Sequence, residues 1–413
     1  MQTMKRIVII NNNNWSLTYG IGTYTVNLIE CLQRTEYAFD IVYLNASEYE
    51  LKIVENIGYR DIFIPAFSDP TNRKLPAYCM MIPFLLKELF HTDDEIIFHI
   101  NFFLTDYLIE NLKTTFNCKI LLSVHYTNWG LKLSGNTRKL NELVYKEKKE
   151  QPVSPQEKKV MDTIQSDKAI FRQTDHVLFV AQHTAKVYSH LSLLQDTNYT
   201  IVNNGLKDKY KKLSTVQKQT ILKRYQIKES ETILFFAGWL AEIKGINCLI
   251  EAFKKVLRSN PDVHLFIAGE GDFSTLLPKA RFAGSQITFL GLLDKSEVYK
   301  FYSIADIGIT CSIYEEFGFV ALEMMMHQLP IIVSNTGGLA EIIDDHVNGL
   351  KVPVVYQKGK RTVDTNQLAQ KISFLIDNPD ERMRLGKNAR KKFLSNYELS
   401  VFCSKMKQVY NTI

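Results

Sequence analysis

Short apolar runs alternate along this chain with longer stretches in which apolar residues recur every three to four positions. The short runs have the length and the Val, Ile and Phe content of buried β-strands, and the longer stretches have the spacing of amphipathic helices. This alternation predicts an α/β fold, in which helices cover the faces of a parallel sheet. The predicted strands form two series, at 7–10, 41–44, 96–100, 120–124 and 177–180, and then at 233–237, 263–268, 287–290, 307–310 and 331–334.

The two series predict two domains, which a length of 413 residues also favours. The segment 203–212 lies between them and is polar, basic and turn-prone. We therefore expect an N-terminal Rossmann-like domain over 1–205 and a C-terminal one over 206–385. A final helix over 386–413 is expected to pack back toward the N-terminal domain. A charged stretch at about 129–172 interrupts the first series and is predicted to form inserted helices.

The composition is that of an ordinary globular protein, with 46% hydrophobic and 23% charged residues. The longest apolar run, 79–86, contains a proline and falls well short of the roughly 20 apolar residues of a spanning helix. The N-terminus has no cleavage site typical of a signal peptide. These features predict a cytoplasmic protein. Peripheral contact with the inner face of the membrane stays open because the inserted helices are basic, although a solvated face also explains their charge.

The charged and sulfur-containing residues give weaker signals. The net charge is +6, the chain is nearly neutral up to Gly205, and the basic excess lies beyond it. An anionic ligand of the C-terminal domain would favour this distribution, and a solvated basic surface explains it equally well. We expect no nucleic-acid partner. The six cysteines lie far apart, without a C-x-x-C pair or metal-ligand spacing, and are predicted to be buried thiols.

The segment Ser312–Glu323 directly follows the predicted strand 307–310 and opens a helix. Gly318 lets the backbone approach a ligand closely, and the free N–H groups at the start of the next helix suit phosphate oxygens. Glu323 falls one to two turns into that helix, among apolar neighbours. A carboxylate there needs a partner, and either a ribose diol or a backbone group would serve. The pattern thus predicts a phosphate site at the helix start and leaves two roles open for Glu323.

Glu315 and Glu323 have seven residues between them and enclose a Phe-Gly pair. This pattern resembles the E-x7-E signature of glycosyltransferase family 4 and other retaining enzymes of the GT-B fold. The strand and glycine pair in 330–343 and the turn at Asn348-Gly349 resemble the parts that follow it in that family. The resemblance implies two Rossmann-like domains whose parallel sheets face each other across a cleft. It also implies that Glu315 contacts donor-sugar hydroxyls and that Glu323 holds the ribose. The backbone implied at the diphosphate comprises Phe317, Gly318, Phe319 and Val320.

An earlier segment, 235–245, resembles the one that supplies an arginine and a lysine to the donor diphosphate in this family. Lys244 matches the lysine, and a cation there would stabilise the departing negative charge. A solvated loop lysine is the alternative. Trp239, after Gly238, stands where the arginine is expected, so half of the cationic clamp is missing. The turns that resemble the family's base-binding parts contain Gly269, Glu270, Gly271 and Leu292.

In the N-terminal domain, Gly20 and Gly22 follow the first predicted strand and open a helix. A dinucleotide fingerprint is disfavoured because Thr25 replaces its third glycine and the second strand ends at Asn45, which is not acidic. The resemblance places these glycines opposite the donor diphosphate. It also implies that His125, at the end of a strand, lies beside the donor sugar, although a structural histidine remains an alternative. His99 is a weaker candidate near the acceptor.

These features together predict a retaining glycosyltransferase that moves a sugar from a nucleotide-diphosphate sugar to a glycan, lipid-linked or peptide hydroxyl. A UDP-sugar is the favoured donor, and a GDP-sugar is a rival. No D-x-D sequence follows a strand, so we expect neither a metal nor a cofactor besides the donor. Two alternatives stay open. One is a nucleotide-sugar epimerase or hydrolase of the same fold, and the other is a non-catalytic scaffold, suggested by Trp239 and by His327-Gln328.

Overall fold

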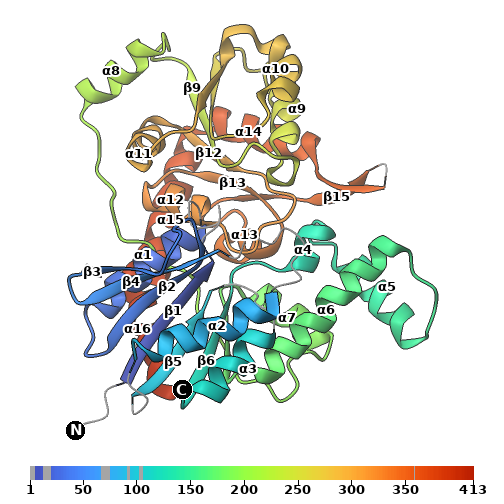
Figure 1. Ribbon diagram of the computed structural model, residues 1–413. Helices are drawn as coiled ribbons and strands as arrows, with labels where there is room; N and C mark the ends of the chain where they lie inside the picture. The colour runs from blue at the N-terminus through green and yellow to red at the C-terminus, as the bar shows by residue number, and fades with distance from the viewer. Residues whose placement is uncertain (1–4, 13–19, 67–74, 91–93, 102–105, 358) are drawn as a thin grey trace. The chain divides into compact units, whose positions relative to one another are not determined.

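The computed structural model of the protein describes residues 5–12, 20–66, 75–90, 94–101, 106–357 and 359–413. The contacts within the chain divide it into two compact units. Unit 1 comprises 1–133, 137–205 and 399–413, and unit 2 comprises 134–136 and 206–398. Each unit has its own β-sheet with helices packed on it (Figure 1).

Unit 1 is built on an eight-stranded sheet of order β3-β4-β2-β1-β5-β6-β7-β8. Its strands are β1 (Lys5–Asn12), β2 (Ala38–Ala46), β3 (Lys52–Asn56), β4 (Tyr59–Pro65), β5 (Glu95–Ile100), β6 (Cys118–Val124), β7 (His176–Phe179) and β8 (Tyr199–Ile201). Neighbouring strands are parallel except β3 and β4, which pair antiparallel at one edge. The five strands predicted in this part of the chain are all present. The pattern missed three strands: every residue of β3 is in the exposed class, β4 carries charged residues and β8 has only three residues.

The helices of unit 1 cover both faces of its sheet. They are α1 (Gly20–Leu32), α2 (Leu75–Lys87), α3 (Asp106–Thr115), α4 (Asn128–Lys132), α5 (Thr137–Lys148), α6 (Pro155–Gln173), α7 (Gln182–His190) and α16 (Leu399–Thr412). Because side chains alternate along a strand, Phe98 and Leu122 enter the core with α2, α3 and α6, whereas His99 and Ser123 point to the opposite face. Tyr24 of α1 and Tyr410 of α16 meet them there through hydrogen bonds.

Unit 2 is built on a six-stranded, fully parallel sheet of order β11-β10-β9-β12-β13-β14. Its strands are β9 (Thr232–Ala237), β10 (Val263–Ala268), β11 (Ile287–Gly291), β12 (Ile307–Thr310), β13 (Ile331–Ser334) and β14 (Leu350–Val352). The five strands predicted for this series all formed, with bounds that agree to within a residue. A separate antiparallel hairpin, β15 (Val354–Gln357) and β16 (Lys360–Val363), extends away from the sheet of its unit (Figure 1).

The helices of unit 2 also form two layers on their sheet. They are α8 (Thr215–Arg224), α9 (Ile246–Val256), α10 (Phe273–Ala280), α11 (Lys295–Ile304), α12 (Phe319–Met326), α13 (Gly337–Ile342), α14 (Thr365–Asp377) and α15 (Pro379–Asn396), with short 3-10 turns η2 (Glu242–Lys244) and η3 (Arg281–Gln286). Phe236 joins the core with α9 and α14. Its neighbour Phe235 points the other way and stacks on Phe301 of α11, with ring centroids 5.4 Å apart. Burial of both faces explains why the strands read as continuous apolar runs.

The end of the chain forms two helices instead of the single helix expected over 386–413. Helix α15 belongs to unit 2 and ends at Asn396, and α16 belongs to unit 1 and begins at Leu399. The N–H of Tyr397 still donates to the carbonyl oxygen of Phe393 in α15, at 2.8 Å, and the break follows directly after it. The N–H of Leu206 donates to the carbonyl oxygen of Tyr397 at 2.8 Å, and Leu206 and Glu398 form a β-bridge.

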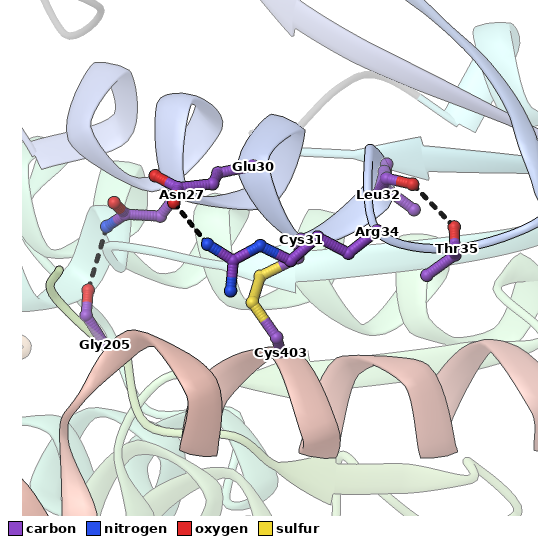
Figure 2. Close-up of a disulfide and its surroundings, with 8 residues drawn as sticks. All are labelled: Asn27, Glu30, Cys31, Leu32, Arg34, Thr35, Gly205 and Cys403. Carbon is purple, nitrogen blue, oxygen red and sulfur yellow. Dashed lines mark hydrogen bonds and ion pairs between the residues drawn. A yellow bond between two sulfur atoms is a disulfide. The ribbon is translucent and has the colours of Figure 1, made fainter. Parts of the chain in front are cut away.

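Two of the cysteines correct the expectation of free thiols. Cys31 of α1 and Cys403 of α16 form a disulfide between positions 372 residues apart in the sequence (Figure 2). Phe402 packs beside it against Tyr24, with ring centroids 5.5 Å apart. The pairing could not be predicted from spacing because only the packing of these two helices brings the cysteines together. The free thiols are those of Cys79, Cys118, Cys248 and Cys311.

Candidate functional site

The turn from β12 into α12 has the geometry that its sequence suggested. Gly318 has a φ of +115°, and a Cβ placed there would lie 2.7 Å from Cδ2 of Leu339. Only glycine meets both conditions without strain. Helix α12 then begins at Phe319, so its first N–H groups have no carbonyl partner from a preceding turn. The positive end of the helix dipole adds to these donors and favours an anion at this position.

The next turn of the sheet supports this loop. The N–H of Gly338, in α13, donates to the carbonyl oxygen of Glu315 at 3.0 Å. A Cβ on Gly338 would lie 2.4 Å from the carbonyl oxygen of Phe317. The second glycine of the pair is therefore required by direct backbone contact with the loop that carries Glu315.

Lys244 and Glu315 are brought together although 71 residues separate them. The Nζ of Lys244 lies 2.7 Å from Oε2 of Glu315, and the hydroxyl of Ser312 donates to the same oxygen at 3.1 Å. The side chains of the ion pair are 30% and 20% exposed, so a ligand can reach both. Gly245 permits this approach, because it has a φ of +73° and a Cβ there would lie 1.9 Å from the carbonyl oxygen of Cys311.

Glu323 is buried in α12, and its side chain is only 2% exposed. The hydroxyl of Tyr302 donates to Oε2 at 3.1 Å, and Lys295 forms an ion pair with Oε1. Burial and the nearby Glu323 carboxylate raise the pKa of Tyr302 well above its usual value, which keeps this hydroxyl protonated as a donor. The carboxylate therefore has one buried neutral partner and one half-exposed cation.

Sequence reasoning missed both partners of Glu323. Lys295, Tyr299 and Tyr302 are spaced four and three residues apart, which predicts a common face of a helix. That spacing could have linked the three residues to one another. It could not show that this face of α11 packs on α12, because the packing depends on the tertiary fold.

The glycine turns at the ends of β9, β10 and β11 are joined by backbone hydrogen bonds. Gly238 donates to Ala268 at 3.0 Å, and Gly269 donates to Gly291 at 2.7 Å. A Cβ on Gly269 would lie 1.8 Å from the carbonyl oxygen of Gly238, and one on Gly271 would lie 2.6 Å from Cβ of Leu240. These glycines therefore permit the turns to pack together at the carboxyl edge of the sheet.

Three predicted residues of these turns have exposed side chains. Trp239 is 49% exposed and Leu292 is 64% exposed, and Glu270 is exposed as well. Exposed apolar groups at the carboxyl ends of parallel strands lie where ligands bind in open α/β sheets. Apart from Glu323, which lies further along α12, the predicted site residues of the C-terminal series thus belong to loops or helix starts at this edge of unit 2.

The other predicted residues belong to unit 1. Gly20 and Gly22 lie in the first turn of α1, and the preceding segment 13–19, with Tyr19, is outside the described residues. His125 is half-buried just after β6. Its ring lies against that of Tyr24, with centroids 4.3 Å apart. Burial lowers the pKa of His125 to about 3, so the ring is neutral near pH 7.

His99 does not have the exposure of a ligand-binding residue. It is fully buried, and its two ring nitrogens face the hydroxyls of Tyr410 and Ser123, each at 2.6 Å. The weaker prediction of an acceptor-side role is therefore replaced by a structural one, in which His99 links β5 to α16. Within the described parts of the chain, no group of three or more His, Cys, Asp or Glu side chains could hold a metal ion.

The segment that contains the Lys244–Glu315 pair matches a known protein family. The profile of the glycosyl transferases group 1 family matches residues 217–392. The C-terminal part of the chain, residues 217–392, is thus similar to this family.

Individual relatives and solved structures are also similar to this chain. The chain is 36% identical over 143 residues to the uncharacterized glycosyltransferase MJ1607 of Methanocaldococcus jannaschii, covering 34% of this chain and 36% of that protein. Sucrose-phosphate synthase from Thermosynechococcus elongatus has a TM-score of 0.77 at 20% identity, over 99% of this chain and 98% of its own. The Anabaena protein Alr3699/HepE, solved in complex with UDP-glucose, has a TM-score of 0.71 at 12% identity, over 99% of this chain and 100% of its own.

The structural and the sequence comparisons cover different parts of the chain and support different conclusions. The structural likeness confirms the predicted α/β fold with two Rossmann-like sheets of the GT-B type. The sequence matches span about a third to a half of the curated relatives' length. The group 1 segment includes the site residues of unit 2 from Gly238 to Glu323, whereas Gly20, Gly22 and His125 lie outside it. None of the described helices is long and apolar enough to cross a membrane.

Proposed function

We propose that this protein transfers a sugar from a nucleoside-diphosphate sugar to a hydroxyl acceptor, with retention at the anomeric carbon. The observation that carries the proposal is the Lys244–Glu315 ion pair beside the loop into α12. It combines a cation, a partly exposed carboxylate and free helix N–H groups within one unit. A diphosphate leaving group requires the first and third of these, and sugar hydroxyls require the second.

In this proposal, Lys244 and the N–H groups of Phe319 and Val320 stabilise the negative charge that develops on the departing diphosphate. Glu315 orients Lys244 through their ion pair and accepts hydrogen bonds from the donor sugar. Glu323 accepts hydrogen bonds from the ribose. Gly20, Gly22 and His125 are proposed to contribute from unit 1, to the diphosphate and the sugar respectively.

A UDP-sugar is the favoured donor, because the similar Anabaena protein was solved with UDP-glucose. The proposed acceptor is a hydroxyl of a glycan, a lipid-linked glycan or a peptide. The predicted cationic clamp is half filled in this chain, because Trp239 occupies the position expected to hold an arginine. Lys244 is therefore expected to contribute more to diphosphate binding here than it would beside a second cation.

The test combines calorimetry with UDP and GDP and a transfer assay with the matching sugar nucleotides. We expect Lys244→Met to weaken nucleotide binding by about 10- to 100-fold, since it removes a charge-assisted contact. Glu315→Gln should bind the nucleotide nearly normally and lose sugar transfer. Lys279→Met is the matched control, because Lys279 is an exposed lysine of unit 2 that donates to Asn247.

Other results would point to the alternatives. Binding of neither nucleotide by the wild-type protein would contradict a transferase and favour a scaffold. Release of free sugar or of an epimer in the absence of any acceptor would favour a hydrolase or epimerase. Normal transfer by Glu315→Gln would remove Glu315 from the proposed site.

A further inference from the structure

A chain of buried polar side chains runs from α1 to His125 across the carboxyl ends of β1, β5 and β6. It begins at Thr25, whose hydroxyl donates to the carbonyl oxygen of Ile21 at 2.9 Å. A carbonyl oxygen only accepts, so this hydrogen bond uses the single proton of the hydroxyl. The oxygen of Thr25 can then only accept from its other neighbour, which is Nδ2 of Asn11 at 3.3 Å.

The direction of this first hydrogen bond fixes the orientation of the next two side-chain amides. Because Asn11 turns its NH2 group toward Thr25, its Oδ1 faces Asn101, and Nδ2 of Asn101 donates to it at 3.0 Å. Asn101 therefore presents Oδ1 to the ring of His125, whose Nε2 lies 3.4 Å away. Thr25 is 3% exposed and both asparagines are fully buried, so water cannot easily replace these partners.

The last step concerns the proton on His125. An amide oxygen only accepts, so the ring nitrogen that faces it must carry hydrogen. The ring is neutral near pH 7, because burial lowers its pKa to about 3. A neutral imidazole has one N–H group, so Nδ1 keeps its lone pair. The described residues provide no hydrogen-bond partner for that nitrogen, and contact with Tyr24 restricts the ring.

We infer that Thr25, Asn11 and Asn101 are positioning residues that hold His125 in the Nε2–H tautomer and so present Nδ1 as a fixed hydrogen-bond acceptor. The group that such an acceptor takes is a neutral hydroxyl, because a phosphate or carboxylate oxygen has no proton to donate. The claim that a substrate hydroxyl donates to Nδ1 rests on the proposed function, whereas the claim about the tautomer does not.

His99, the other predicted strand-end histidine of unit 1, lacks this arrangement. Both ring nitrogens of His99 have hydroxyl partners, Tyr410 and Ser123, and either hydroxyl can donate or accept. Nothing in that pair sets a direction for the proton. The hydrogen bonds that lead from the carbonyl oxygen of Ile21 to His125 do set one.

The test is nitrogen NMR on the full chain labelled in its nine histidines, with His125 assigned from the signal lost in His125→Gln. The expected wild-type spectrum shows a protonated Nε2 and an unprotonated Nδ1. Asn101→Leu removes the accepting oxygen and should give a mixture of tautomers. Asn101→Asp keeps an accepting oxygen and should restore the Nε2–H form, which protects the test if the leucine variant folds poorly.

Thr25→Val should also mix the tautomers, because Asn11 then loses the partner that fixes its orientation. The matched control is Thr174→Val, since Thr174 is a buried threonine of unit 1 whose hydroxyl likewise donates to the carbonyl four residues earlier, at 2.8 Å. It should leave the His125 signals unchanged. An Nδ1–H form in the wild type, or an unaltered Nε2–H form in Asn101→Leu, would overturn the inference.

A transfer assay separates this inference from the proposed function. If the tautomer is as inferred and the enzyme transfers sugar, Asn101→Leu should lower kcat by about tenfold and Asn101→Asp should recover part of that loss. If no nucleotide binds, the proposed function fails while the tautomer result still stands. If Thr174→Val lowers kcat as much as Thr25→Val does, the loss reflects a general packing effect and contradicts the positioning role.

Discussion

Glu323 and Lys295 form an ion pair whose two side chains differ in burial, at 2% and 52% exposed. The carboxylate lies inside α12, and the lysine is the first residue of α11. Tyr302 fixes the other carboxylate oxygen from within the core. Glu323 thus has one permanent partner and one that can move into solvent, which suits a carboxylate that exchanges a protein cation for a ligand.

The first prediction concerns stability. Lys295→Met should lower the free energy of unfolding by about 1–3 kcal/mol, because it leaves a buried carboxylate without its cation. Glu323→Gln in the same chain should recover most of the loss by removing the charge. Urea unfolding of the wild type, the two single variants and the double variant measures the effect. Lys300→Met is the control, since Lys300 pairs with Glu297 on the surface of the same helix and should change stability by less than about 0.5 kcal/mol.

The second prediction concerns nucleotide binding and depends on the ribose role of Glu323. Lys295→Met should bind UDP more tightly, by about tenfold, because the ribose hydroxyls then donate to a carboxylate that has lost its cationic partner. The gain should vanish with 2′,3′-dideoxy-UDP, which cannot make these contacts. Calorimetry with both nucleotides decides it. An equal change for both, or weaker UDP binding, would mean that Lys295 does not yield its place to the ribose.

The third prediction is a pH dependence of stability. Asp167 of α6 is 1% exposed and accepts from the hydroxyl of Tyr188 at 2.6 Å, and burial raises its pKa to about 7. Its unfolded value is about 4. Between these values the folded state binds the extra proton, so the free energy of unfolding should fall as pH rises from about 4 to 7, by a few kcal/mol at most.

Asp167→Asn supplies the measurement for this effect. The asparagine cannot ionise and can still accept from Tyr188, so its unfolding free energy should lose most of that decline with pH. Thermal or urea unfolding at intervals between pH 4 and 8 compares the two proteins. Parallel pH profiles would show that Asp167 is charged throughout this range in the folded state.

Much of the fold could be predicted because the strands of both sheets are buried on both faces. Phe235 and Phe236 illustrate this, since each packs on a different helical layer and the run therefore reads as apolar throughout. The edge strands β3 and β8 lack that pattern. The break before α16 could not be predicted from the sequence pattern either, because it depends on pairing with Leu206, nearly two hundred positions earlier in the chain.

The candidate site divides in the same way. Gly318 and Gly338 could be selected from sequence because only glycine fits where backbones touch. The contacts of Lys295 with Glu323 and of Asn101 with His125 could not, since each joins polar residues whose own neighbourhoods carry no special pattern. Local motifs thus identified the backbone of the site, whereas the partners that orient its side chains required the tertiary structure.

The fourth prediction concerns the Cys31–Cys403 disulfide. The denatured, unreduced chain should react with four equivalents of a thiol reagent, and the reduced chain with six. Reduction should lower the stability of unit 1 by roughly 2–4 kcal/mol, because the bond restricts a very long loop in the unfolded chain. Cys31→Ser/Cys403→Ser is the control, and its unfolding should not respond to the reductant. Six reactive thiols without reduction would contradict the bond.

The last prediction concerns Trp239, which is 49% exposed at the end of β9 and stands where the family resemblance implies an arginine. If the site binds a diphosphate, Trp239→Arg should tighten UDP binding by about tenfold, since one charge-assisted contact contributes on the order of 1.5 kcal/mol. The gain should shrink as salt is raised, because the position is exposed. Trp239→Leu removes the ring without adding charge and should not show that salt dependence. Weaker binding by both variants would mean that the indole itself contacts the donor, so that this chain has replaced an ionic contact with a stacking one.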